Sequence, residues 1–189
     1  MLELFRTDLV QAKLLKADDT LGALRFALFF AKSRTCRIHF FIRLRASNCG
    51  LLRYFSKRWL SRYFIEVGSN TKIGTHFWLP HPRCIIIADH VIIGDHVHIG
   101  QYVTIGGNFK KVRILETGEE QRLPILGSRI NVHPGAVIGG PVQIGSQVII
   151  GANAVVTKDV PNNVIVFGQN VIMKKRINLP PEGGRFEVI

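Results

Sequence analysis

Acidic residues are missing from a long stretch of this chain: between Thr20 and Ile65 every charged residue is Lys or Arg. The whole chain has 25 Lys and Arg against 13 Asp and Glu, a formal net charge of +12. Aromatic side chains alternate with these cations, and such a stretch suits an anionic partner: phospholipid headgroups, a nucleic acid or an acidic carrier. The cations concerned are Arg25, Lys32, Arg34, Arg37, Arg43, Arg45, Arg53, Lys57, Arg58 and Arg62.

Cysteines and long apolar runs are also scarce. The three cysteines form no CxxC pair, which predicts reduced thiols in a cytosolic protein. The longest apolar run, Phe26 to Ala31, is far too short to cross a bilayer, and Glu3 and Asp8 near the start do not suit a secretory signal. With 47% hydrophobic residues the chain is too apolar to be disordered. We expect a cytoplasmic protein, with at most a peripheral contact to the inner face of the membrane.

The first third of the chain reads as helical. Leu2, Phe5 and Leu9 recur at helical spacing, and Asp18 to Thr20 offers helix-capping side chains before a second apolar series. The polar group 47–50 predicts a turn, followed by a helix from about Leu51 to Phe64.

From Val67 onward the hydrophobic period becomes six. Neither a helix nor an ordinary strand has this period, whereas hexapeptide β-helices do. Each hexapeptide is expected to form one side of a triangular coil, with its aliphatic residue inward and the following glycine at a corner that a β-carbon would crowd. The repeated aliphatic positions are Val67, Ile73, Leu79, Ile87, Ile93, Ile99, Ile105, Leu126, Val132, Ile138, Ile144, Ile150 and Val156.

Two interruptions break this period, and interruptions of a rigid solenoid are where function usually lies. Leu79 and Ile87 are eight residues apart, so two residues are inserted beside Pro80 and His81. A polar loop spanning 106–125 separates Ile105 from the later repeats.

The run LPHPRCIIIADHVIIGDHVHIGQYVTIGGN, the loop, and then IGSQVIIGANAVVTKDVP resemble the serine acetyltransferase branch of the hexapeptide acyltransferases. Within that branch the chain looks closer to members associated with capsule and exopolysaccharide synthesis. The resemblance covers about residues 64–172. It implies acetyl-CoA as co-substrate and a homotrimer, with each active site in a cleft between neighbouring solenoids.

The resemblance also assigns site residues. His81 stands where the family has its general base, and Glu66, fifteen residues earlier, stands where the family has the acidic partner. The serine enzymes have Asp where this chain has Pro80, and a second histidine of an Arg-His-Pro motif where this chain has Leu123. Both departures remove groups associated with gripping serine. Arg122, which opens the altered motif, is expected to contact the acceptor.

Acyl transfer from a thioester to a hydroxyl needs a base, oxyanion donors and a grip on the thioester. Histidine suits the first task because its ordinary pKa lies near neutrality. The backbone N–H groups of Gly106 and Gly107 are the candidate oxyanion donors. By resemblance, coenzyme A extends past Ala152 towards Lys158 and a basic cluster that includes Lys175 and Arg176. Glu66, the two glycines and the basic cluster each also have a plain structural interpretation.

A metal site is the natural rival, since zinc sites occur on this same kind of solenoid. His76 and His81 are five residues apart, and His96 and His98 are two apart on one extended side. Neither pair has an evident third ligand, so we expect no metal.

The sequence therefore predicts a mainly β protein: a left-handed parallel β-helix of hexapeptide repeats with a short α-helical N-terminal region. The expected divisions are a basic helical region 1–65, a β-helix 66–172 and a tail 173–189. The favoured function is O-acetylation of a sugar in surface polysaccharide synthesis. The alternatives are O-acetylation of L-serine, and a non-catalytic solenoid that binds a membrane or a partner. Because residues 25–62 combine cations with aromatics, we expect peripheral contact with anionic membranes rather than a nucleic-acid role.

Overall fold

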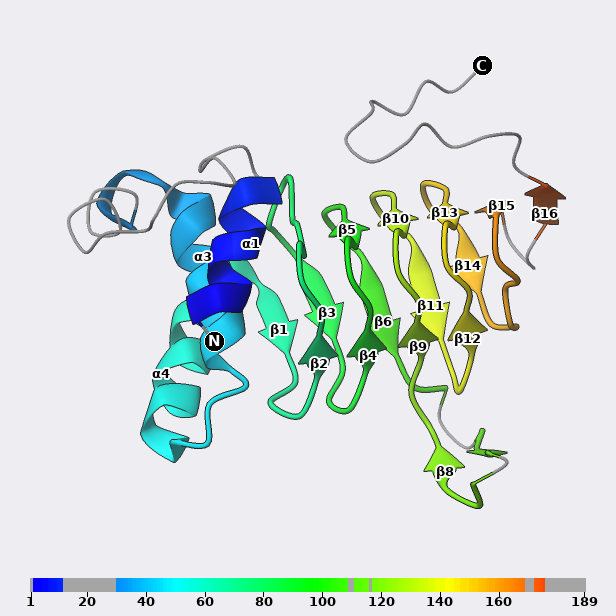
Figure 1. The fold of residues 1–189 in the computed structure, drawn as a ribbon, viewed down its shortest axis with the longest axis horizontal. Coiled ribbons are helices and arrows are strands. Elements are labelled where there is room, and N and C mark those ends of the chain that lie inside the picture. Colours follow the sequence, from blue (N-terminus) through cyan, green and yellow to red (C-terminus); the bar gives the residue numbers. More distant parts are fainter. Residues whose placement is uncertain (1, 12–29, 109–110, 116, 169–171, 176–189) are drawn as a thin grey trace.

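The computed structural model describes residues 2–11, 30–108, 111–115, 117–168 and 172–175. A group of helices lies at one end of a long parallel β-helix, and a thin hairpin projects from its side (Figure 1). The capping signal at Asp18 to Thr20 and the start of the basic segment lie outside the described residues. The helices are α1 (Leu2–Gln11), α3 (Arg34–Leu44), α4 (Gly50–Leu60) and the 3-10 helix η1 (Ser61–Tyr63).

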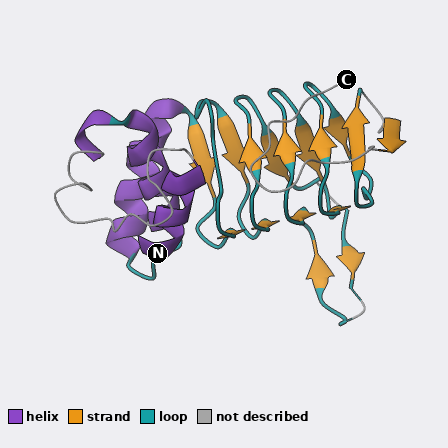
Figure 2. Ribbon diagram, turned by 45° about the horizontal axis from the view of Figure 1, so that its top comes forward, coloured by secondary structure: helices purple, strands orange, loops and turns teal. Residues whose placement is uncertain are grey.

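The β-helix has three parallel faces, which we call A, B and C (Figure 2). Face A consists of β1 (Ile65–Val67), β3 (Ile85–Ile87), β6 (Thr104–Gly106), β11 (Val137–Gly139) and β14 (Val155–Val156). Face B consists of β2 (Lys72–Ile73), β4 (Ile92–Ile93), β9 (Ile125–Leu126) and β12 (Gln143–Ile144). Face C consists of β5 (His98–Ile99), β10 (Asn131–Val132), β13 (Ile149–Ile150) and β15 (Val164–Phe167), with β16 (Ile172–Lys175) pairing antiparallel at its end.

Strand pairing fixes the length of a regular coil. Ile138 of β11 pairs with Val156 of β14, and 156 − 138 is 18 residues, or three hexapeptides. In the first coil Val67 pairs with Ile87, a step of 20, which places the predicted two-residue insertion there. The period of six is thus confirmed as one face per hexapeptide.

The core contains two inward side chains per face. The predicted aliphatic residues are buried, apart from the partly buried Ile73. A second buried series, four positions further along each repeat, was not recognised in the sequence because its smaller members do not stand out. This second series consists of Phe77, Val91, Val97, Val103, Ile130, Ala136, Val142, Val148, Ala154 and Val160.

A ladder of short polar side chains closes the corner between faces B and C. The N–H of Thr75 donates to Oδ1 of Asp95 at 2.6 Å, and the N–H of Asp95 donates to Oγ of Ser128 at 3.1 Å. The next steps run through Ser146 and Asn162. A β-carbon on Gly74 would lie 2.5 Å from that Oδ1 of Asp95, so the predicted crowding is confirmed at this corner. The crowding atoms include the polar side chain of the coil above. The predicted crowding was wrong for Gly106 and Gly139 of face A, where a β-carbon would meet no described atom closer than 3.9 Å.

The helices share the core of the β-helix. Ile38, Ile42 and Leu60 pack in the same buried cluster as Phe77 and Leu79 of the first coil. The predicted turn and second helix are confirmed, with α4 ending at Leu60 and η1 continuing to Tyr63. All three cysteines are free, and burial raises the pKa of the Cys36 thiol to about 11 although Arg37 opposes the shift.

Three cations of the basic segment fasten the helices rather than face solvent. Arg43 is buried, and its guanidinium donates to the carbonyls of Ile73 and Gly74 at 2.7 and 2.6 Å. Arg45 donates to the carbonyl of Val67 at 2.9 Å. Arg37 donates to the carbonyls of residues 30 and 31 at 2.7 Å. Arg43 and Arg45 thus supply donors to carbonyls of the first coil, and Arg37 to carbonyls just before α3, because buried or partly buried backbone carbonyls need donors.

Candidate active site

His81 lies in the two-residue insertion at the corner where face C returns to face A. Trp78 pairs with His98 on face C just before it, and β3 begins on face A at Ile85 just after it. Pro82 is buried while His81 is exposed, so the insertion is anchored on one side of the histidine. Among the described residues the His81 side chain makes no hydrogen bond or ion pair, which leaves its imidazole available to a ligand.

Glu66 lies on β1 with its side chain outward on face A. It pairs laterally with Ile86 of β3, and Ile86 in turn pairs with Thr104 of β6. No hydrogen bond or ion pair joins Glu66 to His81 or to any other side chain in the described ranges. The predicted contact of carboxylate with imidazole is thus not formed within this chain, and the orienting role of Glu66 stays a prediction.

Gly106 and Gly107 stand where the chain leaves face A for the loop. A β-carbon on Gly106 would meet nothing closer than Ala88 at 3.9 Å, and one on Gly107 would meet the carbonyl of Arg122 at 3.6 Å. A side chain at either position would make ordinary contacts only, and the role of these N–H groups as oxyanion donors stays a prediction. Arg122 is exposed and its guanidinium forms an ion pair with Glu120 at 2.6 Å.

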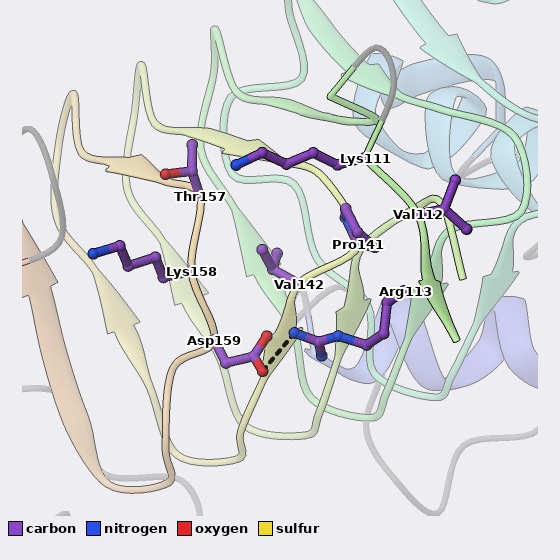
Figure 3. Close-up of a pocket in the computed structure, with 8 residues that line it drawn as sticks. All are labelled: Lys111, Val112, Arg113, Pro141, Val142, Thr157, Lys158 and Asp159. Atoms are coloured by element: carbon purple, nitrogen blue, oxygen red, sulfur yellow. Dashed lines mark hydrogen bonds and ion pairs between the residues drawn. The ribbon is translucent and has the colours of Figure 1, made fainter. Parts of the chain in front are cut away.

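The loop carries an antiparallel hairpin, β7 (Arg113–Ile114) with β8 (Glu120–Gln121), that projects from the β-helix. The base of this hairpin and the corner between faces A and B line an open cavity of about 500 Å³ (Figure 3). Its lining residues are Lys111, Val112, Arg113, Pro141, Val142, Thr157, Lys158 and Asp159.

The cavity is cationic and held together by one ion pair. Arg113 Nη2 lies 2.7 Å from Asp159 Oδ2, and the N–H of Gln143 donates to Asp159 Oδ1 at 2.8 Å. Burial alone would raise the pKa of Asp159, but the bonds from Arg113 and Gln143 and the charge of Arg113 outweigh it, so its pKa lies below the ordinary value. The Lys111 and Lys158 ammonium groups remain for an anionic ligand such as a phosphate.

The predicted site residues thus divide between the two edges of face A. His81 and Ala152 lie at the corner between faces C and A, whereas Gly106 and Lys158 lie at the corner between faces A and B. The main chain of Lys175 lies in β16 beside Ile165's strand, and Arg176 lies outside the described residues.

Sequence reasoning missed Lys111, Arg113 and Asp159. A signal was present, because Ile144 pairs with Val160, a step of 16 rather than 18, so the last coil is two residues short at Thr157 to Asp159. The cavity lies where this shortened repeat meets the basic stretch of the loop. The shortening becomes evident only from the strand pairing of Ile144 with Val160.

Three of the four histidines considered for a metal contact other side chains. His96 stacks on His76 with ring centroids 4.2 Å apart, and Nε2 of His98 lies 2.7 Å from the Gln11 amide nitrogen of α1. Burial lowers the pKa of His98, and His96 lowers it further. Within the described residues no group of three His, Cys, Asp or Glu side chains is placed to hold a metal ion.

The chain is similar to known hexapeptide-repeat proteins. A family model described as "Bacterial transferase hexapeptide (six repeats)" matches residues 124–158. The solved serine acetyltransferase of Neisseria gonorrhoeae superposes with a TM-score of 0.72 at 22% identity, covering 95% of this chain and 66% of that one. Isoform 3 from Entamoeba histolytica, solved with cysteine, gives a TM-score of 0.64 at 24% identity, covering 98% and 61%. The predicted left-handed β-helix of hexapeptide repeats is confirmed.

Curated relatives add sequence similarity. Serine acetyltransferase of Helicobacter pylori is 36% identical over 120 residues, 61% of this chain and 66% of that protein. Serine acetyltransferase of Staphylococcus aureus (strain Mu50) is 37% identical over 113 residues, 58% and 49%. Galactoside O-acetyltransferase of Lactococcus lactis is 43% identical over 53 residues, 28% and 23%. The chain covers no more than 66% of any of these three relatives, and the matches fit a hexapeptide-repeat acyltransferase of the serine acetyltransferase-like branch.

Proposed function

We propose that this protein is an acetyl-CoA-dependent O-acetyltransferase with His81 as its general base. The observation that carries the proposal is the placement of an exposed histidine, without a partner among the described residues, at the inserted corner of a hexapeptide β-helix whose relatives are acetyltransferases. A solenoid that only binds a partner would not need an available imidazole at that corner.

The chemistry follows from the residues. His81 takes the proton of the acceptor hydroxyl as its oxygen attacks the thioester carbonyl, and the C–O bond forms. Backbone N–H groups at Gly106 and Gly107 stabilise the oxyanion. The tetrahedral intermediate then expels the coenzyme A thiolate, which receives the proton held by His81. Glu66 serves as a positioning residue that fixes the imidazole tautomer.

The cavity at the base of the hairpin supports coenzyme A binding. Its Lys111 and Lys158 suit the phosphates of the co-substrate, and the ion pair of Arg113 with Asp159 ties the base of the hairpin to the corner that carries Lys158. The cavity and His81 lie at opposite edges of face A. In a homotrimer, His81 of one subunit could face the cavity of the next, so that base and co-substrate meet between subunits. The separation within one chain thus supports a homotrimer.

L-Serine is the acceptor suggested by the serine acetyltransferases among the relatives. Both serine acetyltransferases described above align with more than half of this chain. A sugar hydroxyl is the second candidate, because Pro80 and Leu123 replace groups associated with gripping serine and because a galactoside O-acetyltransferase is among the relatives.

The test is coenzyme A release from acetyl-CoA with L-serine, free sugars and nucleotide sugars as separate acceptors. Turnover that depends on serine selects the first candidate, and turnover only with sugars selects the second. Absence of coenzyme A release with every acceptor, from a folded protein that binds acetyl-CoA, would reject transfer in favour of a binding role.

A further inference from the structure

α4 has an apolar outer face as well as an apolar inner one. On its inner side Ser56 and Leu60 are buried. Leu51, Tyr54 and Phe55, which share the opposite side at helical spacing, are 63%, 63% and 55% exposed. A surface helix normally directs polar residues outward, and contiguous exposed apolar side chains mark an interaction surface.

Cations frame this outer face. Arg58 follows Leu51 by seven residues and so lies on the same side of the helix, while Lys57 and Arg62 are exposed nearby in the chain. The side chains of these three make no hydrogen bond or ion pair with the described residues. No acidic residue occurs in α4 or η1 to neutralise them.

The basic segment therefore has two distinct parts. Arg37, Arg43 and Arg45 form one part. Their guanidinium groups donate hydrogen bonds to backbone carbonyls and, for Arg43, to the Asp8 carboxylate. Among the described residues, Lys57, Arg58 and Arg62 are free on α4 and directly after it, while Lys32 and Arg34 are exposed at the start of α3. Of these free cations, only those on and directly after α4 lie beside exposed apolar and aromatic side chains of the same helix.

We propose that the outer face of α4 is a docking surface for anionic phospholipid membranes. Leucine and aromatic side chains on one face insert at the headgroup boundary while Lys and Arg contact the phosphates. A second copy of this chain fits less well, because two-fold packing of this face would place Arg58 near Arg58 with no acid to compensate. None of the described helices is long and apolar enough to cross a membrane, so docking here lies at the surface.

The docking helix is connected directly to the His81 corner. The N–H of Cys84 donates to the carbonyl of Tyr63, and that of Ile85 to the carbonyl of Phe64, both at 3.1 Å. Tyr63 ends η1, which follows α4 directly, and Phe64 is the next residue. Docking through α4 would hold the candidate active site close to the membrane, which favours an acceptor carried in lipid. Membrane binding itself does not depend on the proposed catalysis.

The experiment is vesicle co-sedimentation of the full chain, without substrates. Phosphatidylcholine vesicles are compared with an equimolar mixture of phosphatidylcholine and phosphatidylglycerol, at low salt and at about 1 M salt, where the Debye length is about 3 Å. We expect binding to the mixed vesicles only, lost at high salt. Lys57→Gln, Arg58→Gln and Arg62→Gln should each weaken binding roughly fivefold, and all three together about a hundredfold.

Apolar variants separate insertion from charge. Leu51→Ser with Phe55→Ser should reduce binding at least tenfold, whereas Ile114→Ser, an equally exposed side chain on the hairpin, should leave it unchanged. Because all these positions are exposed, melting temperatures should not change. Equal binding to neutral and anionic vesicles, no binding at low salt, or a concentration-dependent oligomer abolished by the α4 variants without any vesicle binding would each overturn the proposal. Turnover plays no part in these measurements, so their failure is distinct from failure of the proposed function.

Discussion

Asp8 and Arg43, thirty-five residues apart, form a doubly bonded ion pair in the interior: Arg43 Nη2 lies 2.6 Å from Asp8 Oδ1 and Nε lies 2.8 Å from Oδ2. Asp8 also accepts the N–H of Phe77 at 2.9 Å. The pair therefore joins α1, α3 and the first coil of the β-helix at one point. Both side chains are almost fully buried, so neither can exchange its partner for water.

We expect Asp8→Asn to lower the free energy of unfolding by about 3–5 kcal/mol, because it leaves the Arg43 charge buried without its counterion. Chemical denaturation followed by circular dichroism measures this. Glu3→Gln is the matched control, since Glu3 pairs with Arg6 at the surface and its loss should cost at most about 1 kcal/mol. Equal effects of the two substitutions would contradict a stabilising role of the buried Asp8–Arg43 ion pair.

His81→Ala should lower turnover at least 10²-fold with the melting temperature retained, since a general base contributes that much. The assay is coenzyme A release with the best acceptor found. His90→Ala is the control, because His90 is an exposed histidine of the corner between faces A and B. Near-normal turnover of a folded His81→Ala protein would end this mechanism.

Glu66→Gln tests the positioning role. If Glu66 orients His81 across an interface between subunits, the substitution should lower kcat with KM for acetyl-CoA unchanged and should alter the pH profile of kcat. Glu119→Gln, an exposed carboxylate of the hairpin, should change neither. If the Glu66→Gln protein keeps the wild-type kcat and pH profile, Glu66 has no positioning role and is only a structural residue of face A.

The cavity predicts a different kinetic signature. Lys158→Ala should raise KM for acetyl-CoA about tenfold or more with little change in kcat, because it removes a charge-assisted contact to a phosphate and leaves the reacting atoms untouched. Lys72→Ala, on face B, should have no effect. A fall in kcat at unchanged KM would place coenzyme A elsewhere.

Asp95 predicts a pH dependence of stability. The N–H and hydroxyl of Thr75 both donate to its Oδ1, at 2.6 and 2.8 Å, and these bonds lower the pKa of Asp95 although burial opposes them. Because the folded pKa lies below the unfolded one, the stabilisation is complete above about pH 4. It is lost as pH falls through the folded pKa.

Denaturation curves of wild type and Asp95→Ala should therefore differ at pH 7 and converge in acid. The carboxylate is exposed, so the difference at pH 7 should be modest. A difference that stays constant down to pH 2 would show that packing at the corner, rather than the carboxylate charge, is what the substitution removes.

The repeat, the coil of three hexapeptides and the insertion at His81 were all predictable from sequence. Each depends on local spacing: an aliphatic residue every six positions can be buried only if every hexapeptide makes one side of a coil. The second inward series was less evident because Ala136 and Ala154 carry weak hydrophobic signals, although their burial is complete.

The tertiary structure alone decided which charges are free. Arg43 and Arg58 both stand in the acid-free segment, among apolar and aromatic residues. Arg43 is nevertheless buried against Asp8, whereas Arg58 faces solvent. That difference depends on how the helices meet the first coil, where unpaired carbonyls such as that of Ile73 attract donors. It also decided that Lys111 and Lys158 share a cavity, since strand pairing across coils brings residues from distant parts of the chain to one corner. Periodicity in sequence reports local geometry; partners across coils are set by the pairing of the whole β-helix.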